Sequence, residues 1–236
     1  MSRLNNSPGR PILCYVTDRQ DLRKADPEDA HEELLHKVEI AAAAGVNWIQ
    51  IREKDLSGRD CALLTREVLR RAAKPPPVQA AATRILVNDR LDVALSEHAG
   101  GVHLGESSLP VAEVRQFVDS LAPDRDFLVG ASRHSLAAAR SAAKHGADYL
   151  FFGPVFATPS KAAYGPPQGL ERLAEVCRAV SIPVLAIGGI TVENAAACLR
   201  AGASGIAGIR LFQDAGDLPS VVGILRGSAN SLPRSG

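Results

Sequence analysis

The sequence predicts a single α/β domain, a (β/α)8 TIM barrel. Eight short apolar segments recur along the chain, and helix-forming stretches rich in Ala, Leu, Glu and Arg separate most of them. Strands that alternate with helices form parallel sheets with right-handed crossovers, and strands that are apolar almost throughout have both faces covered. Eight such units in a chain of 236 residues fit a closed barrel. A doubly wound open sheet is the alternative.

The eight expected strands share a short apolar core that ends near polar residues or glycines. They span residues 12–17, 47–51, 84–88, 101–104, 127–131, 148–153, 183–188 and 205–209. Helical spacing is clearest in the stretches at 32–44, 59–73, 170–180 and 194–201. Several helices end alike, because AAAAGV, KHGAD and LRAGAS each place a glycine just past the last helical residue. The third and fourth strands are separated only by a short helical stretch, 90–98.

The composition is ordinary for a globular protein, with 46% hydrophobic and 22% charged residues and a net charge of +1. It contains no basic stripe of the kind that a nucleic-acid partner requires. The sequence also lacks the roughly 18 consecutive apolar residues of a membrane helix and the apolar stretch of a signal peptide. We therefore expect a cytoplasmic protein. The four cysteines stand singly, without a CxxC pair, and are expected to be buried free thiols.

One domain is expected over residues 11–226, with flexible tails at 1–10 and 227–236 that are rich in Ser, Asn, Gly, Pro and Arg. The proline-rich piece 74–78 is interpreted as a rigid loop inside that domain. The sequence does not reveal the oligomeric state, and a homo-oligomer is one option.

Function in this fold gathers at the carboxyl ends of the strands, where the loops leading into the helices meet. The second strand is followed by Gln50, Arg52 and Lys54, which alternate. Alternate side chains of a strand point the same way, so all three are expected to face the barrel mouth. Two cations and an amide at one point predict a phosphate or pyrophosphate site. The alternative is a solvated strand end paired with Glu53 or Asp55.

The third strand ends in Asn88 and Asp89. This pair could hold a hard cation such as Mg²⁺, which is usually bound by one or two carboxylates together with substrate phosphates. It could also orient a substrate amine. The alternative is a cap for the helical segment that begins at Arg90.

A glycine pair, Gly188 and Gly189, follows the seventh strand directly. Glycine lets backbone N–H groups approach an anion without a Cβ in the way, and loops after the seventh and eighth strands often build a phosphate site in this fold. Arg210 at the end of the eighth strand would reinforce such a site. A plain tight turn is the alternative.

The long loop 156–169 carries Thr158, Ser160 and Lys161 and is either an active-site lid or a surface insertion. His134, after the fifth strand, is a candidate general acid or base, and His103 in the fourth strand is a weaker one. Two phosphate sites on either side of acid–base groups predict an enzyme that acts on one or two small phosphorylated molecules.

Six motifs in order closely resemble the thiamin phosphate synthase / thiazole tautomerase (TenI) family. They cover roughly residues 12–212 and read IQIREKDLSGRD, LVNDRLDVAL, GVHLGESSLP, GASRHS, FFGPVFATPSK and IPVLAIGGITVEN. The resemblance implies a TIM barrel with one of two activities. The synthase joins hydroxymethylpyrimidine pyrophosphate to thiazole phosphate, expels pyrophosphate and needs magnesium. The tautomerase isomerises a thiazole phosphate carboxylate without a metal.

The resemblance to the synthase also implies roles for individual residues. Gln50, Arg52, Lys54 and Asn88 would bind the pyrimidine pyrophosphate, and Asp89 would bind magnesium. Ser132 and Lys161 would contact the pyrophosphate as catalytic residues, together with the acid–base candidate His134. The thiazole phosphate would be held by Thr158 and Ser160, with Gly189 in the backbone cradle. Gly188 and Arg210 are added to this substrate site by their positions after the seventh and eighth strands, and not by the resemblance.

The sequence departs from the synthase pattern in two places. Ser108 stands where the family usually has a second metal-binding Asp, and Glu106 could supply the missing carboxylate. Arg210 stands where a small Ser is common, and it could either contact the phosphate or fill the pocket. Three readings therefore remain open: the synthase, the tautomerase, and a silent barrel that binds thiazole phosphate or thiamin phosphate.

Overall fold

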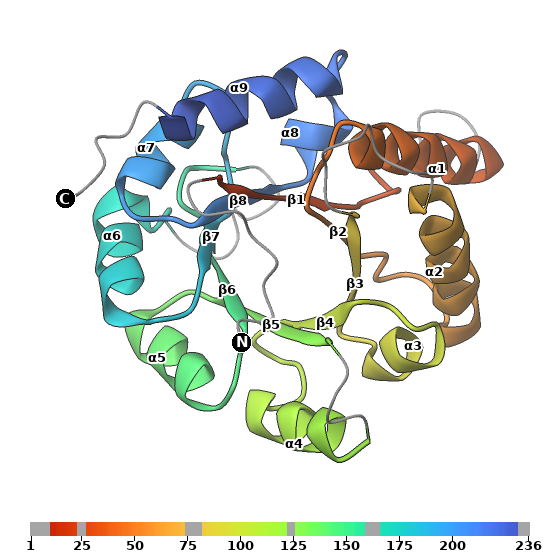
Figure 1. Cartoon of the computed structure of the whole chain (residues 1–236), viewed down its shortest axis with the longest axis horizontal. Helices are drawn as coiled ribbons and strands as arrows, with labels where there is room; N and C mark the ends of the chain where they lie inside the picture. Colours follow the sequence, from red (N-terminus) through yellow and green to blue (C-terminus); the bar gives the residue numbers. More distant parts are fainter. Residues whose placement is uncertain (1–9, 23–26, 74–81, 122–125, 159–165, 231–236) are drawn as a thin grey trace.

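The computed structural model describes residues 10–22, 27–73, 82–121, 126–158 and 166–230. Within these ranges eight parallel strands form a closed barrel, in which each strand is hydrogen-bonded to the next and the last to the first. Helices form a ring around the strands (Figure 1). The predicted (β/α)8 barrel is confirmed, and the open sheet is excluded because the ladder between the first and eighth strands closes the ring.

The strands have the order and approximate positions expected from the sequence. They are β1 (Ile12–Val16), β2 (Trp48–Ile51), β3 (Arg84–Asn88), β4 (Gly101–Leu104), β5 (Leu128–Arg133), β6 (Tyr149–Phe152), β7 (Val184–Ala186) and β8 (Gly205–Gly208). The described helices are α1 (Pro27–Ala43), α2 (Gly58–Ala72), α3 (Leu91–Ser96), α4 (Val111–Leu121), α5 (Leu136–Lys144), α6 (Gly169–Ala179), α7 (Ala195–Arg200), α8 (Arg210–Gln213) and α9 (Leu218–Asn230).

The glycine stops predicted after three helices are present. Gly45, Gly146 and Gly202 follow α1, α5 and α7, and all three have a positive φ, at 82°, 93° and 100°. Residues with a Cβ rarely adopt this left-handed conformation. The stops therefore end each helix and turn the chain toward the next strand.

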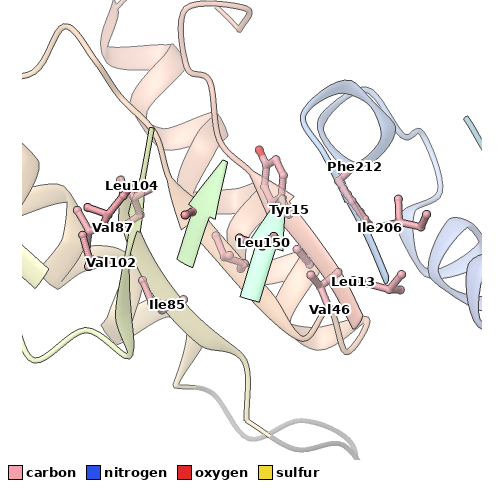
Figure 2. Packing of buried hydrophobic residues seen from close by; sticks show 14 of the residues in the cluster. Leu13, Tyr15, Val46, Ile85, Val87, Val102, Leu104, Leu150, Ile206 and Phe212 are labelled. Carbon is pink, nitrogen blue, oxygen red and sulfur yellow. The ribbon is translucent and has the colours of Figure 1, made fainter. Parts of the chain in front are cut away.

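The apolar core has two layers, because alternate residues of each strand point to opposite sides of the barrel wall. The outer layer lies between strands and helices, and its packing around Leu13, Ile85 and Leu150 is seen in Figure 2. The inner layer fills the barrel itself, where the rings of Trp48 and Tyr149, from β2 and β6, lie 4.6 Å apart. The barrel is thus a packed core that is closed below its mouth.

A glycine in β5 makes room for this inner layer. A Cβ on Gly130 would lie 2.0 Å from the Tyr149 ring, which is far inside van der Waals contact. The buried Tyr149 ring therefore depends on the bare backbone of the neighbouring strand.

The expected features at the edges of the domain are covered only in part. The N-terminal tail up to residue 9, the proline-rich piece 74–78 and the lid residues 159–165 lie outside the described residues. At the C-terminus α9 continues to Asn230, into the stretch expected to be a tail. The four cysteines are free thiols, three of them buried and Cys177 partly buried. No helix in the described ranges is long and apolar enough to cross a bilayer.

Candidate active site

A layer of polar side chains caps the apolar interior of the barrel at the carboxyl ends of the strands. It consists of the last inward-facing residues of four neighbouring strands, namely Gln50, Asn88, His103 and Ser132. The inner apolar residues Trp48, Leu86 and Leu128 lie two or four positions earlier on β2, β3 and β5. Because every second residue of a strand faces the interior, each of these strands has apolar inward-facing residues deep in the barrel and a polar one at the mouth.

Gln50 is fixed in this layer by its neighbour. Its Nε2 donates to Asn88 Oδ1 over 2.9 Å, and the residue is only 2% exposed. Its Oε1 is also buried but has no hydrogen-bond partner in the described part of the chain. A buried acceptor without a partner costs about 1–3 kcal/mol. Gln50 is therefore ready to accept a hydrogen bond from a donor on a bound molecule.

Arg52 continues the alternation past the end of β2 and carries the positive charge of the mouth. Its Nη1 lies 3.5 Å from the carboxylate of Asp18, which follows β1. The backbone N–H of Asp18 donates to Gln213 Oε1 over 3.2 Å, and Gln213 Nε2 donates to the Asp18 carbonyl over 2.9 Å. Arg52 is therefore paired with a carboxylate on a fixed loop in the absence of substrate.

The expected convergence of Gln50, Arg52 and Lys54 on one anion stays a prediction, and in the structure Gln50 and Arg52 contact different partners, Asn88 and Asp18. Lys54 lies in the turn after β2 and has an exposed side chain. Strand alternation no longer governs its direction there, because the extended backbone has ended. The assignment of Lys54 to a shared anion site remains a prediction.

Glu53, between the two cations, is turned to the other side and buried. Its carboxylate accepts from the Thr17 hydroxyl over 2.6 Å and from the Arg19 N–H over 3.0 Å. Thr17 Oγ1 in turn accepts from the Arg52 N–H over 3.1 Å. Burial raises the pKa of the Glu53 carboxyl, against the opposing effect of the hydrogen bonds from Thr17 and Arg19. Glu53 thereby ties the loop after β1 to the loop after β2 and holds Arg52 in place.

Asp89 lies at the end of β3 with a left-handed backbone, at φ 58°. Such a conformation is uncommon outside glycine, although Asp and Asn adopt it more readily than most residues, and strained backbone of this kind clusters at functional sites. One carboxylate oxygen accepts from the Gly105 N–H over 3.2 Å and contacts the Ser108 hydroxyl. The other accepts from Asn88 Nδ2 over 2.8 Å. The Asp89 carboxylate is thus held in a fixed orientation at the rim.

Within the loop after β4 the side chain that contacts Asp89 is that of Ser108, and not that of Glu106. Glu106 is exposed and lines a different cavity, on the outer side of the barrel with Arg133. No group of three or more His, Cys, Asp or Glu side chains with metal-site geometry occurs among the described residues. A cation at this rim would therefore be bound by one carboxylate, neighbouring neutral oxygens and its own substrate.

His103 connects the apolar interior to the rim. Its Nδ1 lies 3.0 Å from the Tyr149 hydroxyl and its Nε2 lies 2.8 Å from the Ser132 hydroxyl. Burial lowers the pKa of His103 to about 3, so the ring is neutral near pH 7. A phenol is a better donor than an alcohol. The arrangement that follows has Tyr149 donating to His103 and His103 donating to Ser132, which leaves the Ser132 proton free for a ligand.

His134 directly follows the last residue of β5, in the short connection to α5. Its Nδ1 contacts the carbonyl oxygen of Gly153. A carbonyl only accepts, so Nδ1 carries a proton, and Nε2 is the nitrogen that faces away from this contact. The His134 ring is thereby oriented with one nitrogen available for proton transfer.

The glycine pair after β7 is needed for a close approach within the chain itself. Gly188 and Gly189 have positive φ values of 93° and 65°, and a Cβ on Gly189 would lie 2.5 Å from the Ala157 carbonyl oxygen. The Gly188 carbonyl accepts from the Phe156 N–H over 3.0 Å. The pair thus seats the loop after β6 against the loop after β7, which a plain turn would not require.

Arg210 begins α8, its side chain is 51% exposed, and its Nε lies 3.5 Å from the Asp21 carboxylate. Because β8 pairs with β1, Arg210 extends toward the loop that follows the adjacent strand. Thr158 is partly buried. Ser160 and Lys161 lie outside the described residues, so their assignments remain predictions.

Two contributors to this site, Gln213 and Tyr149, were not anticipated from the sequence, and each acts by holding another residue in place. Glu53 was considered only as an ion-pair partner of the strand end, whereas Arg52 pairs with Asp18. A Glu or Gln that is buried is rarely without a partner. The partner itself is a tertiary contact that spacing does not reveal.

Comparison with known proteins points to one family. The model of the family described as "Thiamine monophosphate synthase" matches residues 13–212. Two relatives named thiamine-phosphate synthase are similar along most of their length. The one from Methanoculleus marisnigri is 46% identical over 190 residues, 79% of this chain and 83% of the relative. The one from Roseiflexus castenholzii is 41% identical over 199 residues, 84% of this chain and 79% of the relative.

A solved structure agrees with these matches. The thiamine phosphate pyrophosphorylase from Pyrococcus furiosus superimposes with a TM-score of 0.75 and 32% identity, and the superposition covers 95% of this chain and 98% of that one. The likeness therefore extends over essentially the whole barrel.

The buried Glu53 gives a pH test of this site. A folded-state pKa above the ordinary value means that the folded chain keeps a proton which the unfolded chain has already lost. The free energy of unfolding should therefore fall as pH rises from near 4.5 through the raised pKa. In Glu53→Gln this contribution is absent. The stability of the wild type relative to the variant should consequently decrease between pH 4.5 and neutrality.

Urea unfolding of both proteins across that range measures the difference. Glu113→Gln, at an exposed glutamate of α4, is the matched control and should show no such trend. A difference between wild type and Glu53→Gln that stays constant, or grows with pH, would contradict the burial of this carboxyl.

Proposed function

This chain belongs to the thiamine monophosphate synthase family, and on that premise we propose that it joins hydroxymethylpyrimidine pyrophosphate to thiazole phosphate and releases pyrophosphate. It is accordingly a transferase of thiamin biosynthesis whose substrates are small phosphorylated molecules. The single observation that carries the proposal is the polar rim at the barrel mouth, where Gln50, Arg52, Asp89 and Ser132 lie on neighbouring strand ends.

The reaction places a specific demand on this rim. Departure of pyrophosphate from the pyrimidine leaves a carbocation and a strongly charged leaving group. Groups that already point at the developing negative charge lower the barrier without reorganising during the reaction. Arg52 would bind the leaving anion by charge, and Ser132 would donate to it the proton that His103 leaves free. Lys54, Asn88 and Lys161 are proposed to complete this anion site.

The pyrimidine would lie deeper, against Gln50. The unpaired Oε1 of Gln50 is a buried acceptor, and an exocyclic amino group on the ring would satisfy it. The opposite wall would be formed by His103 and Phe151, whose ring centroids lie 4.2 Å apart. A neutral His103 suits this role, because a buried imidazolium would repel the forming carbocation.

Binding of the pyrophosphate would also change the pairing of Arg52. The Asp18 carboxylate holds the guanidinium at 3.5 Å when no substrate competes. A pyrophosphate carries more charge than one carboxylate and accepts two parallel hydrogen bonds from a guanidinium. Arg52 would therefore move from Asp18 to the substrate, while Asp18 stays fixed by Gln213.

The residues present fit magnesium. Mg²⁺ is usually held by one or two carboxylates together with substrate phosphates and water, and the rim offers the Asp89 carboxylate beside the Ser108 hydroxyl. We propose Asp89 as the protein carboxylate ligand. When bound, the ion would neutralise the leaving pyrophosphate. Glu106, the other ligand predicted from the sequence, would have to turn inward from the outer cavity to reach the same ion.

The thiazole phosphate is proposed to bind on the opposite side of the mouth. Gly188 and Gly189 leave their N–H groups open to an anion, since neither donates to a backbone acceptor in the described part of the chain. Arg210 begins α8, after the neighbouring strand β8, and would move from Asp21 to the phosphate. Thr158 and Ser160 would contact the same phosphate from the loop after β6.

Two alternatives to the synthase, a thiazole tautomerase and a silent barrel, are distinguished from it by the product that forms or by the absence of one. A thiazole tautomerase would use the free Nε2 of His134 to move a proton, and a silent barrel would bind ligand without turnover. The same histidine is compatible with the synthase, so His134 alone does not distinguish the two enzymes. His134→Gln is the variant that would abolish the tautomerase reaction.

Incubation of the purified protein with both substrates should yield thiamin phosphate only when magnesium is present. Asp89→Asn should lower the rate by about 100-fold or more, because one preorganised electrostatic contact is worth this much in catalysis. Asparagine tolerates the left-handed backbone, so the loss of thermal stability should be limited to the hydrogen bonds that the amide nitrogen cannot accept, about 0.5–1.5 kcal/mol each. Asp92→Asn is the matched control, since the Asp92 carboxylate is exposed and paired with Arg90.

Absence of thiamin phosphate at any magnesium concentration would remove the synthase. Acceleration of thiazole tautomer isomerisation in its place would establish the tautomerase. Binding of thiazole phosphate without either product would leave the silent barrel. A fully active Asp89→Asn enzyme would refute the metal assignment alone.

The serine next to Asp89 gives a separate test of the magnesium site. Ser108→Asp should place a second carboxylate next to that of Asp89. The two carboxylates repel each other when no cation is bound, and both can coordinate a cation when one is present. We expect the magnesium concentration for half-maximal activity to fall by roughly three- to ten-fold, equivalent to about 0.7–1.4 kcal/mol. Thermal stability without magnesium should fall and should recover when the ion is added.

Ser107→Asp at the adjacent exposed position is the control. Glu106→Gln should leave the magnesium titration unchanged if Asp89 and Ser108 form the site, whereas a higher magnesium requirement would reinstate Glu106 as a ligand. An identical titration for Ser108→Asp and the wild type would show that the ion binds elsewhere.

A further inference from the structure

A cavity of about 490 Å³ lies on the outer side of the barrel, between α4 and α5. These helices are neighbours in the ring around the strands (Figure 1). The cavity wall includes Glu106 and Pro110 from the loop before α4, Arg133 from β5, and Ser141 and His145 from the α5 segment. None of the inward-facing residues of the barrel mouth lines it.

Arg133 points into this cavity because of its position in β5. Ser132 faces the interior, where it meets His103, so the next residue faces the helices. Arg133 Nη1 donates to the carbonyls of Gly105, over 3.1 Å, and Ser132, over 2.6 Å. Within the described residues its Nε and Nη2 have no acceptor in the protein, and no carboxylate lies within ion-pair distance of the guanidinium.

A guanidinium in this situation is unusual. It is partly withdrawn from water, and its remaining N–H donors form the edge that binds a carboxylate or phosphate with two parallel hydrogen bonds. Charged groups removed from water are normally paired. The first residues of α4, an 11-residue helix, lie in the same wall and add the positive end of the helix dipole.

We propose that this outer cavity binds a small anion, carrying a phosphate or carboxylate group, through the guanidinium of Arg133. The volume is within the range of small-molecule sites, about 300–1,000 Å³. Ser141 and His145 would supply further polar contacts from α5. The proposal is independent of the reaction at the barrel mouth, because Arg133, Ser141 and His145 have no role there and Glu106 lines the outer cavity and not the rim.

Glu106 sets the selectivity of the cavity. Its carboxylate lines the same wall and its charge acts on Arg133, yet the two groups are not within ion-pair distance. The Glu106 charge therefore opposes an entering anion without neutralising the guanidinium. Anion affinity should consequently rise when Glu106 is made neutral.

Calorimetric titration of the full-length protein with inorganic phosphate, and separately with succinate, tests the site. Arg133→Gln should weaken one binding event by about ten-fold or more, the worth of a charged hydrogen bond. Glu106→Gln should tighten the same event by about two- to five-fold, as expected for an exposed charge. Arg52→Gln, which removes a cation from the barrel mouth, should leave it in place.

The outcomes of these titrations either identify the class of anion or exclude the site. Binding of phosphate but not succinate identifies a phosphate ester as the ligand class, and the reverse identifies a carboxylate. Unchanged affinity for both anions in Arg133→Gln, or no binding by the wild type at millimolar concentrations, would overturn the site. If Arg133→Gln does not fold, Arg133→Lys and Glu106→Gln replace it, and an unaltered affinity in Glu106→Gln would overturn the proposal equally.

Discussion

The alternation of side chains along eight short parallel strands is the constraint on which the molecule depends. The closed ladder admits one register, and a shift by one residue would exchange the inner and outer layers of every strand. In the observed register Trp48 and Leu128 fill the barrel while Gln50 and Ser132 stand above them. The same alternation sends Glu53 and Arg133 outward. One geometric rule thus separates the packed floor, the polar mouth and the outer cavity.

The charges and hydrogen-bond donors of the mouth are held in place by buried groups behind or beside them. Glu53 joins the loops after β1 and β2 through Thr17 and Arg19. Gln213, from a helix near the end of the chain, fixes the loop that carries Asp18. Tyr149 and His103 orient Ser132 from within the barrel. Preorganisation of this kind is what electrostatic catalysis requires, because the supporting contacts are formed before the reaction begins.

Much of this arrangement was accessible from sequence, and the limits follow from the range of each interaction. Strand positions and glycine stops are local properties, and the structure confirms them. Lys54 illustrates the first limit, since alternation stops where the chain leaves the extended conformation and enters a turn. The glycines after β7 illustrate the second limit, which is that one residue type serves more than one purpose. The sequence predicts that they let an anion approach the backbone, whereas the structure also shows the loop that carries Ala157 packed against them. Gln213 and Asp18 are 195 residues apart in the sequence, so the spacing of residues does not predict that they form hydrogen bonds.

The central claim is that the rim residues of β2, β3 and β5 surround one shared anion. A crystal structure of the protein with pyrophosphate and magnesium tests it most directly. The account requires the anion to lie against Arg52 and Ser132, the ion to contact Asp89, and Arg52 to have left Asp18. A pyrophosphate bound away from these side chains, with the pair of Arg52 and Asp18 intact, would contradict it.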